Sequence, residues 1–219
     1  MSFTKQNLTN GTPGDASQIN HAEEQYDAVV ADMAAGTIPV KATALTDTIA
    51  AARLPTRKAS AYLSAKGGDP RTTNGCGPAT KLELSTNKIM RVGLPFDPST
   101  QEYVQFSYAM PEGWDGGDIT FIPYWTAASG SGTVVWGLQA RSIDDNESMD
   151  QAFGTAAEVT DTFLVANKVH KGPSGTITPA GTPAGGELLV FQAYRKQGTL
   201  AVDALLLGIK LEFNTAYGD

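Results

Sequence analysis

GWDGGDITFIPYWTAASGSGTVVWGLQARSI, residues 113–143, holds all three tryptophans of the chain, Trp114, Trp125 and Trp136. Two runs within it alternate between apolar and other residues with a period of two. Apolar residues recur at every second position from 119 to 125 in the first run and from 134 to 140 in the second. Period two is typical of strands with one buried face. The small residues 129–132 join the runs, so the stretch predicts two long antiparallel strands.

Strand patterns continue on both sides of this stretch. With the two runs, at 118–126 and 133–143, the predicted strands are 81–85, 88–93, 103–109, 157–165, 188–195 and 205–213. Gly- and Pro-rich breaks separate them, and no helical pattern is interleaved. The chain is therefore predicted to be mainly β, with an antiparallel β-sandwich or jelly-roll-like domain of about eight strands over residues 57–219.

The aromatic residues divide into a predicted core and a predicted surface set. The alternation favours a core containing Phe106, Tyr108, Phe121, Trp125, Trp136, Phe191 and Phe213. Tyr103, Tyr124, Tyr194 and Trp114 are expected at the surface or at an interface. Exposed rings can stack on the apolar faces of sugars or fill a subunit interface. Trp114, Tyr124 and Tyr194 are therefore the candidate glycan contacts, together with a long, flexible loop at 172–186.

Residues 1–56 have a different character from the β-rich part. Asn20 and Glu23 resemble a helix capping box. The apolar residues Ile19, Ala22, Tyr26, Val29 and Met33 follow a 3-4-3-4 spacing, which is a heptad seam. Such a seam suits self-association or docking into a partner groove, but a surface helix packed on its own domain has the same pattern. An Ala- and Thr-rich neck follows, so 1–56 is predicted to be an anchor, a short helix and a neck.

Composition narrows the classes of function. The formal net charge is -7 with a pI near 4.8, and basic residues do not cluster, which argues against nucleic-acid binding. The single cysteine, Cys76, excludes an intrachain disulfide. No apolar stretch is long enough to span a bilayer, and no signal peptide is recognised at the start. We therefore expect no membrane insertion, and a protein made and kept in a cytosol until assembly.

Catalytic chemistry finds little support in the sequence. The two histidines, His21 and His170, lie in different zones, and neither is near Cys76. The acidic run 144–150 lacks the spacing of a calcium loop and is interpreted as a solvated loop. A polysaccharide hydrolase would need two carboxylates in a cleft, for which Glu112, Asp115 and Asp118 beside Trp114 are the candidates. We expect no catalytic residues, no metal and no cofactor.

Two segments resemble proteins of tailed-bacteriophage virions. NGTPGDASQINHAEEQYDAV, residues 10–29, resembles the N-terminal anchor of phage fibre and appendage proteins through Gly11-Thr12-Pro13, Asp15-Ala16, Ile19-Asn20-His21 and Glu23-Glu24. The second segment, residues 110–163, is similar to β-rich virion proteins. It matches them at Pro111, Trp114, Tyr124-Trp125, Val135-Trp136-Gly137 and Phe153-Gly154. The resemblance implies a jelly-roll-like head, commonly trimeric, on a capsid or tail appendage, and it supplies no catalytic residues.

Three hypotheses follow from the sequence. The leading one is a non-enzymatic virion protein, a homotrimeric fibre, spike or decoration protein assembled in a bacterial host and attached to other virion proteins by its N-terminus. The second is a receptor-binding module for a carbohydrate on the host surface. The third is a polysaccharide hydrolase.

Overall fold

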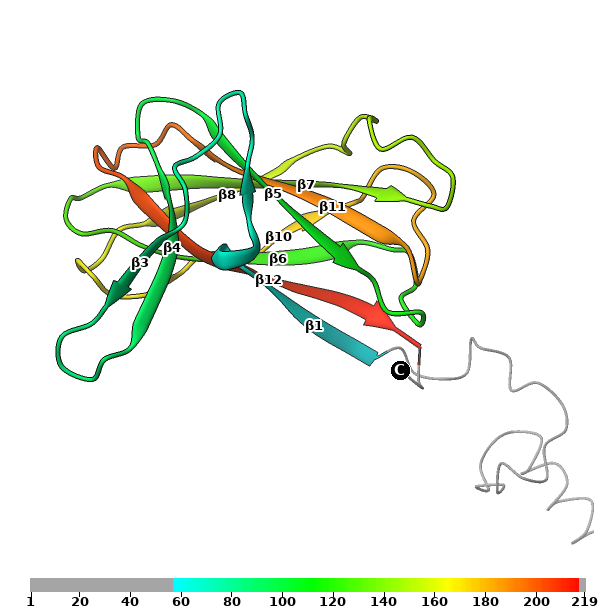
Figure 1. Ribbon diagram of the computed structural model, residues 1–219, viewed down its shortest axis with the longest axis horizontal. Coiled ribbons are helices and arrows are strands. Elements are labelled where there is room, and N and C mark those ends of the chain that lie inside the picture. The colour runs from blue at the N-terminus through cyan, green and yellow to red at the C-terminus, as the bar shows by residue number, and fades with distance from the viewer. Residues whose placement is uncertain (1–56, 217–219) are drawn as a thin grey trace, which may run out of the picture. The chain divides into compact units, whose positions relative to one another are not determined.

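The computed structural model describes residues 57–216, which form a β-sandwich (Figure 1). The predicted heptad residues Ile19, Ala22, Tyr26, Val29 and Met33, and the neck, lie outside the described residues. The strands are β1 (Arg57–Ser64), β2 (Asp69–Pro70), β3 (Thr80–Glu83), β4 (Met90–Phe96), β5 (Glu102–Ala109), β6 (Ile119–Thr126), β7 (Thr133–Ile143), β8 (Ala157–Thr162), β9 (His170–Lys171), β10 (Gly175–Ile177), β11 (Leu188–Lys196) and β12 (Ala204–Thr215). One 3-10 turn, η3 (Ala65–Gly67), follows β1.

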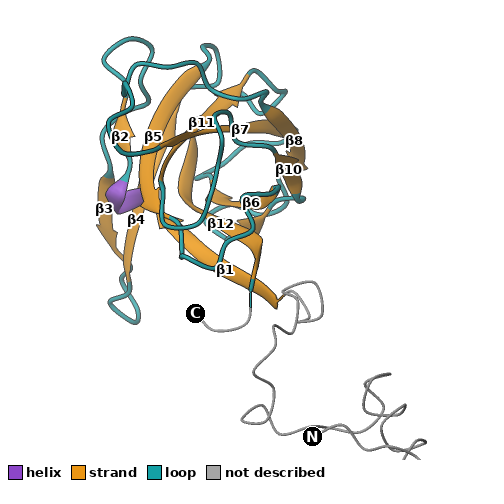
Figure 2. Cartoon of the chain, turned by 90° about the vertical axis from the view of Figure 1, so that its right-hand side faces the viewer, coloured by secondary structure: helices purple, strands orange, loops and turns teal. Residues whose placement is uncertain are grey.

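The strands form two antiparallel sheets. The five-stranded sheet has the order β2-β5-β11-β7-β8. The seven-stranded sheet runs β10-β6-β12-β4-β3, with β1 also paired to β12 and β9 to β6. Figure 2 shows the two sheets curving around a common interior. All eight predicted strands are confirmed. Within residues 57–216, the structure contains no helix with the length and hydropathy of a membrane span.

A bulge in β12 allows this strand to pair with both β4 and β1 along the same edge. Residues 204–206 pair with β4, whereas residues 208–215 pair with β1 (Figure 1). The register against β6 shifts between Leu206 and Gly208, where the extra residue bends the strand. Gly208 has φ 157°, and an added Cβ would lie 2.4 Å from the Tyr62 hydroxyl. Only glycine therefore suits this position, and the bend gives β1 a place in the sheet.

The core lies between the sheets and contains the predicted aromatic residues. Trp125 is completely buried and Trp136 is 2% exposed, with their ring centroids 6.5 Å apart. Phe96 meets Trp136 edge-on at 5.1 Å. Phe106, Phe121, Phe191 and Phe213 are buried, and Tyr108 packs against the cluster from its edge. The prediction of the aromatic core is confirmed.

Two predictions on the outer parts of the domain are wrong. Trp114 was expected at the surface but is 4% exposed, because residues 113–115 bond the end of β12. The Gly113 carbonyl accepts from Ala216 N at 2.7 Å, and Asp115 N donates to the Asn214 carbonyl at 3.3 Å. The segment 172–186 was expected to be a flexible loop, but it contains β10, which pairs with β6. Ala180 also bonds the backbone of β7, so this segment is integrated into the sandwich.

Candidate functional site

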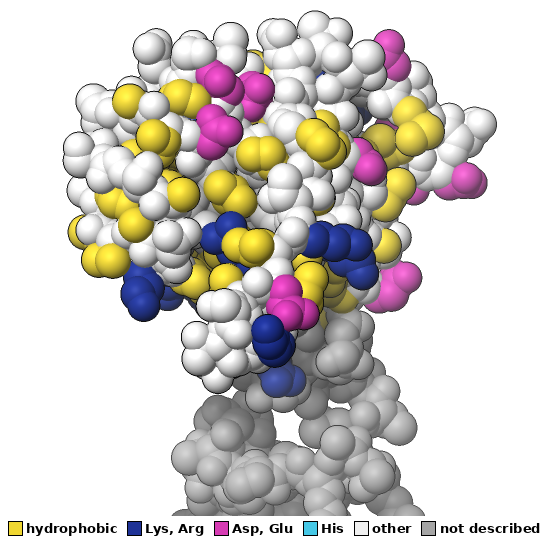
Figure 3. All heavy atoms as spheres, turned by 60° about the vertical axis from the view of Figure 1, so that its left-hand side comes forward, with side chains coloured by type: hydrophobic (Ala, Val, Ile, Leu, Met, Phe, Trp, Pro, Cys, Tyr) yellow, Lys and Arg dark blue, Asp and Glu magenta, His cyan; other side chains and the backbone are white. Residues whose placement is uncertain are grey.

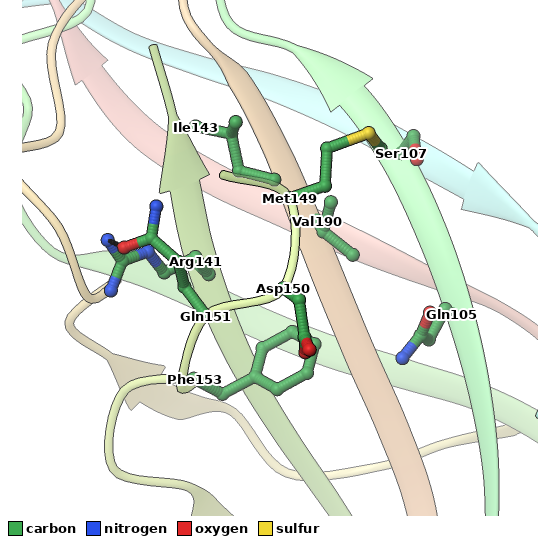
Figure 4. A pocket seen from close by; sticks show the side chains of 9 residues that line it. All are labelled: Gln105, Ser107, Arg141, Ile143, Met149, Asp150, Gln151, Phe153 and Val190. Atoms are coloured by element: carbon green, nitrogen blue, oxygen red, sulfur yellow. Dashed lines mark hydrogen bonds between the residues drawn. The ribbon is translucent and has the colours of Figure 1, made fainter. Parts of the chain in front are cut away.

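A groove of about 400 Å³ lies on the outer face of the five-stranded sheet. Its floor is formed by the adjacent strands β5, β11 and β7, and its wall by the loop between β7 and β8. The lining residues are Gln105, Ser107, Arg141, Ile143, Met149, Asp150, Gln151, Phe153 and Val190. Figure 4 shows Phe153 and Asp150 on the loop, with Gln105 across from them on β5. A concave site with a few polar groups among apolar ones is the usual form of a ligand pocket.

The strand register arranges the floor in rows. Alternation turns Val104 and Phe106 of β5 toward the core, so Gln105 and Ser107 face outward. Ser107, Val190 and Arg141 lie opposite one another on the three strands. The next row contains three glutamines, Gln105, Gln192 and Gln139. The floor therefore combines apolar contact with the amide of Gln105, and the other two glutamines continue its row outside the groove lining.

The amide row is held in place by hydrogen bonds. Gln105 Nε2 donates to Gln192 Oε1 at 3.1 Å, and Arg71 Nη1 donates to the same oxygen at 3.4 Å. Gln192 is only 4% exposed, whereas Gln105 and Gln139 are half-buried. Because an amide has both donors and acceptors, the half-buried Gln105 can bond a ligand in the groove while Gln192 orients its side chain.

Arg141 fixes the loop that forms the wall of the groove. Its guanidinium donates to the Gln151 side chain, to the Ala152 carbonyl at 3.3 Å and to the Ser142 carbonyl at 3.2 Å. Gly154 N also donates to the Ala140 carbonyl at 3.0 Å, next to Phe153. These bonds place Phe153 and Asp150 over the sheet. They also use the Arg141 guanidinium for contacts within the protein.

An aromatic row continues the outer face beyond the glutamines. The rings of Tyr103 and Tyr194 are 5.6 Å apart, and the Arg71 guanidinium lies 4.5 Å from the Tyr103 centroid. Tyr194 covers Gly137, where an added Cβ would lie 2.1 Å from the ring. The Tyr194 hydroxyl donates to Glu158 at 2.9 Å. Burial, together with the bond to the Glu158 carboxylate, raises the pKa of Tyr194 well above its ordinary value.

The structure does not bring the three candidate glycan contacts together. Trp114 is buried in the core. Tyr124 faces outward on β6 of the seven-stranded sheet, 6.2 Å from the exposed Tyr62 ring. Tyr194 lies on the face that carries the groove but is only 5% exposed, because its neighbours pack around it. The expectation that Trp114 and Tyr194 offer exposed rings is therefore wrong, and the ring beside the groove is Phe153.

Sequence reasoning missed the groove because its parts come from distant segments. Gln105, Gln139 and Gln192 each occupy a polar position of an alternating strand, which marks an outward face but not a shared site. Asp150 falls in the acidic run that was interpreted as a solvated loop, and residues 144–150 are indeed exposed. Phe153 appeared only in the sequence resemblance. The available signal was therefore the repetition of glutamine on outward positions of three strands.

The carboxylates considered for hydrolysis lie away from the groove. Glu112, Asp115 and Asp118 are exposed at turns, and none of them lines it. Asp115 accepts from Gly117 N at 2.9 Å, and Asp118 accepts from the Thr178 hydroxyl at 2.6 Å. Within residues 57–216, no group of three His, Cys, Asp or Glu side chains is placed to hold a metal ion.

No known protein family and no curated protein matches the sequence. Solved structures with a similar strand arrangement include carbohydrate-binding modules. One is the CBM22-1 xylan-binding domain of Paenibacillus barcinonensis Xyn10C, at 12% identity and a TM-score of 0.39, covering 72% of this chain and 95% of that one. A family 35 carbohydrate-binding module from Clostridium thermocellum has 8% identity and a TM-score of 0.38, covering 70% of this chain and 97% of that one.

Larger enzymes are also among the similar structures. The chain matches a Paenibacillus sp. cycloisomaltooligosaccharide glucanotransferase at 15% identity and a TM-score of 0.41. The match covers 68% of this chain but spans only 18% of the enzyme. These likenesses concern the β-sandwich alone, and they assign no role to any residue of this chain.

Proposed function

We propose that the β-sandwich of this protein binds a carbohydrate without transforming it, and that the groove on the five-stranded sheet is the binding site. The observation that carries the proposal is the combination of the outward Gln105 amide on the floor with Phe153 and Asp150 on the wall. Sugar rings present hydroxyl groups that both donate and accept hydrogen bonds, together with C–H faces of apolar character. The groove offers partners for both kinds of surface.

Each side chain has a defined part in this proposal. The half-buried amide of Gln105 bonds sugar hydroxyls through the carbonyl oxygen and the N–H that its bond to Gln192 leaves available. The Asp150 carboxylate accepts from further hydroxyls, and hydrogen bonds to charged groups are the stronger ones. Phe153 packs against a sugar face, while Val190 and Ile143 exclude water beside it.

Binding is tested with the full chain on a glycan array, followed by calorimetry with the best ligand. We expect Phe153→Ala and Gln105→Ala each to weaken binding about tenfold, which corresponds to about 1.4 kcal/mol. Tyr124→Ala is the matched control, since it removes an outward aromatic ring from the other sheet. Absence of any glycan ligand, or equal loss in the Tyr124 variant, would contradict the groove assignment.

We also propose, on the sequence resemblance alone, that this domain is the head of a virion appendage held by residues 1–56. Deleting residues 1–35 is expected to leave the β-sandwich folded by circular dichroism but to prevent incorporation into phage particles. Particle incorporation is measured by immunoblotting purified virions. Normal incorporation of the truncated chain would remove the anchor assignment and leave the carbohydrate proposal untouched.

A further inference from the structure

The hairpin of β3 and β4 ends the seven-stranded sheet with an open edge. β3 is the last strand in the sheet order, and among residues 57–216 no strand pairs with its outer side. Every residue of β3 is exposed. Leu82, Leu84, Ile89 and Met90 are 40–59% exposed, and Figure 3 views the side from which the hairpin extends. An open edge with apolar side chains is a template for pairing with another strand.

The register shows which backbone groups of β3 are free. Leu84 N donates to the Ile89 carbonyl at 2.9 Å and the Leu84 carbonyl accepts from Lys88 N at 3.0 Å, so Leu84 directs both backbone groups toward the β4 side, in a hydrogen-bonded position opposite Ile89. Such pairs alternate along an antiparallel ladder, and Leu82 opposite Arg91 is therefore also of this type. It follows that Lys81 and Glu83, between them, direct their N–H and C=O groups away from β4. The open edge is built around one basic and one acidic residue.

We propose that β3 pairs antiparallel with β3 of a second copy of this chain, about a two-fold axis through Leu82. Lys81 of each copy then lies opposite Glu83 of the other. The free N–H and C=O groups of these residues match in two hydrogen-bonded pairs. Leu82 meets Leu82 of the second copy at a non-hydrogen-bonded position, where side chains approach most closely. The contact is self-complementary, as a two-fold interface must be.

Charge selects this register over its neighbours. Registers centred on Lys81 or on Glu83 also match the free backbone groups, but they place like charges directly opposite each other, which is unfavourable. Glu83 at present forms an ion pair with Lys88 at 3.3 Å. Both of those side chains are more than half exposed, and exposed ion pairs contribute little, so Glu83 is able to turn toward Lys81 of the second copy.

The proposed dimer would carry two ligand-binding grooves. The pairing uses an edge of the seven-stranded sheet, whereas the groove lies on the five-stranded sheet, so both grooves stay open. The two grooves of one dimer would bind a repetitive polymer bivalently and with higher avidity. The pairing itself rests only on β3 and does not depend on the carbohydrate proposal.

Cysteine scanning of the full chain tests the register. The native Cys76 is a suitable silent background, because it is 5% exposed and burial raises the pKa of its thiol to about 12. Leu82→Cys is expected to give a disulfide-linked dimer on mild oxidation, since the opposing Cβ atoms would be about 5 Å apart. Lys81→Cys and Glu83→Cys should cross-link when mixed with each other, but not alone. Equal cross-linking of all single variants, or none with Leu82→Cys, would overturn the proposal.

Charge exchange provides a second test, read by sedimentation velocity over a concentration series. Lys81→Glu alone and Glu83→Lys alone each create like-charge pairs, and each should weaken association on the order of tenfold. The double exchange of Lys81→Glu with Glu83→Lys restores opposite charges and should return association to the wild-type level. A double variant that associates no better than the single ones would refute the pairing.

Discussion

Replacing Arg195 by methionine is expected to lower the free energy of unfolding by about 3–5 kcal/mol. Arg195 is completely buried on the inward face of β11 and forms part of no described salt bridge. Its guanidinium donates to the carbonyls of Phe96 at 2.7 Å, Val202 at 2.9 Å and Leu200 at 2.7 Å. Methionine fills much of the volume but removes the Arg195 donors from these three acceptors, and a buried group left unsatisfied costs about 1–3 kcal/mol.

The buried charge on Arg195 carries a desolvation penalty, which opposes the stabilisation from its three hydrogen bonds. Burial lowers the pKa of its guanidinium, while the carboxylates of Asp203, Asp97 and Glu102 raise it. Removing a buried charge relieves desolvation, so a loss of stability would show that the three carbonyl bonds dominate. Urea unfolding of the variant measures the balance, and hydrogen exchange should show residues 197–203 opening first. Lys196→Met is the matched control, because its exposed pair with Glu158 at 3.1 Å contributes at most about 1 kcal/mol. A loss below 1 kcal/mol in Arg195→Met would contradict the expectation.

Replacing Trp136 by alanine is expected to lower the free energy of unfolding by about 3–5 kcal/mol. Trp136 is one of the largest fully buried side chains, and it packs against both Phe96 and Trp125. Alanine would leave a cavity between the two sheets that close packing does not refill. The indole N–H has no hydrogen-bond partner in the described part of the chain, so its removal adds no further loss.

Trp136→Phe separates packing volume from the indole itself. This variant keeps an aromatic ring and should cost about 1 kcal/mol, as the smaller residual cavity implies. Both variants are measured by urea unfolding, with the slope compared to the wild type. Equal losses for alanine and phenylalanine would mean that the cavity is not the cause.

Strand positions were predictable because alternation is a local property. β7 shows it over its whole length, with Val134, Trp136 and Leu138 inward and Gln139 outward. β1 was missed because its sequence, RKASAYLS, is small and polar with one buried residue, Leu63. It becomes a strand by pairing with β12 beyond the bulge at Gly208. Trp114 was misplaced because a Gly- and Asp-rich turn gives no sign that the end of β12 covers it.

The groove on the five-stranded sheet was likewise only partly predictable. Outward positions of Gln105, Gln139 and Gln192 follow from the alternation in each strand. That β11 lies between β5 and β7, so that the three amides share a row, depends on the pairing of Gln192 with Gln105 and Gln139, which are 87 and 53 residues away in the chain. The wall of the groove further depends on Arg141 holding Gln151 and Ala152.

The sequence by itself determined that this protein is mainly β, where its main strands lie and which of their residues face a core. Only the tertiary structure decided the strand order, the buried position of Trp114, the groove beside Phe153 and the open edge at β3. The reason is physical: side-chain alternation is set by neighbours in the chain, whereas strand pairing is set by the burial and hydrogen bonding of residues far apart in it.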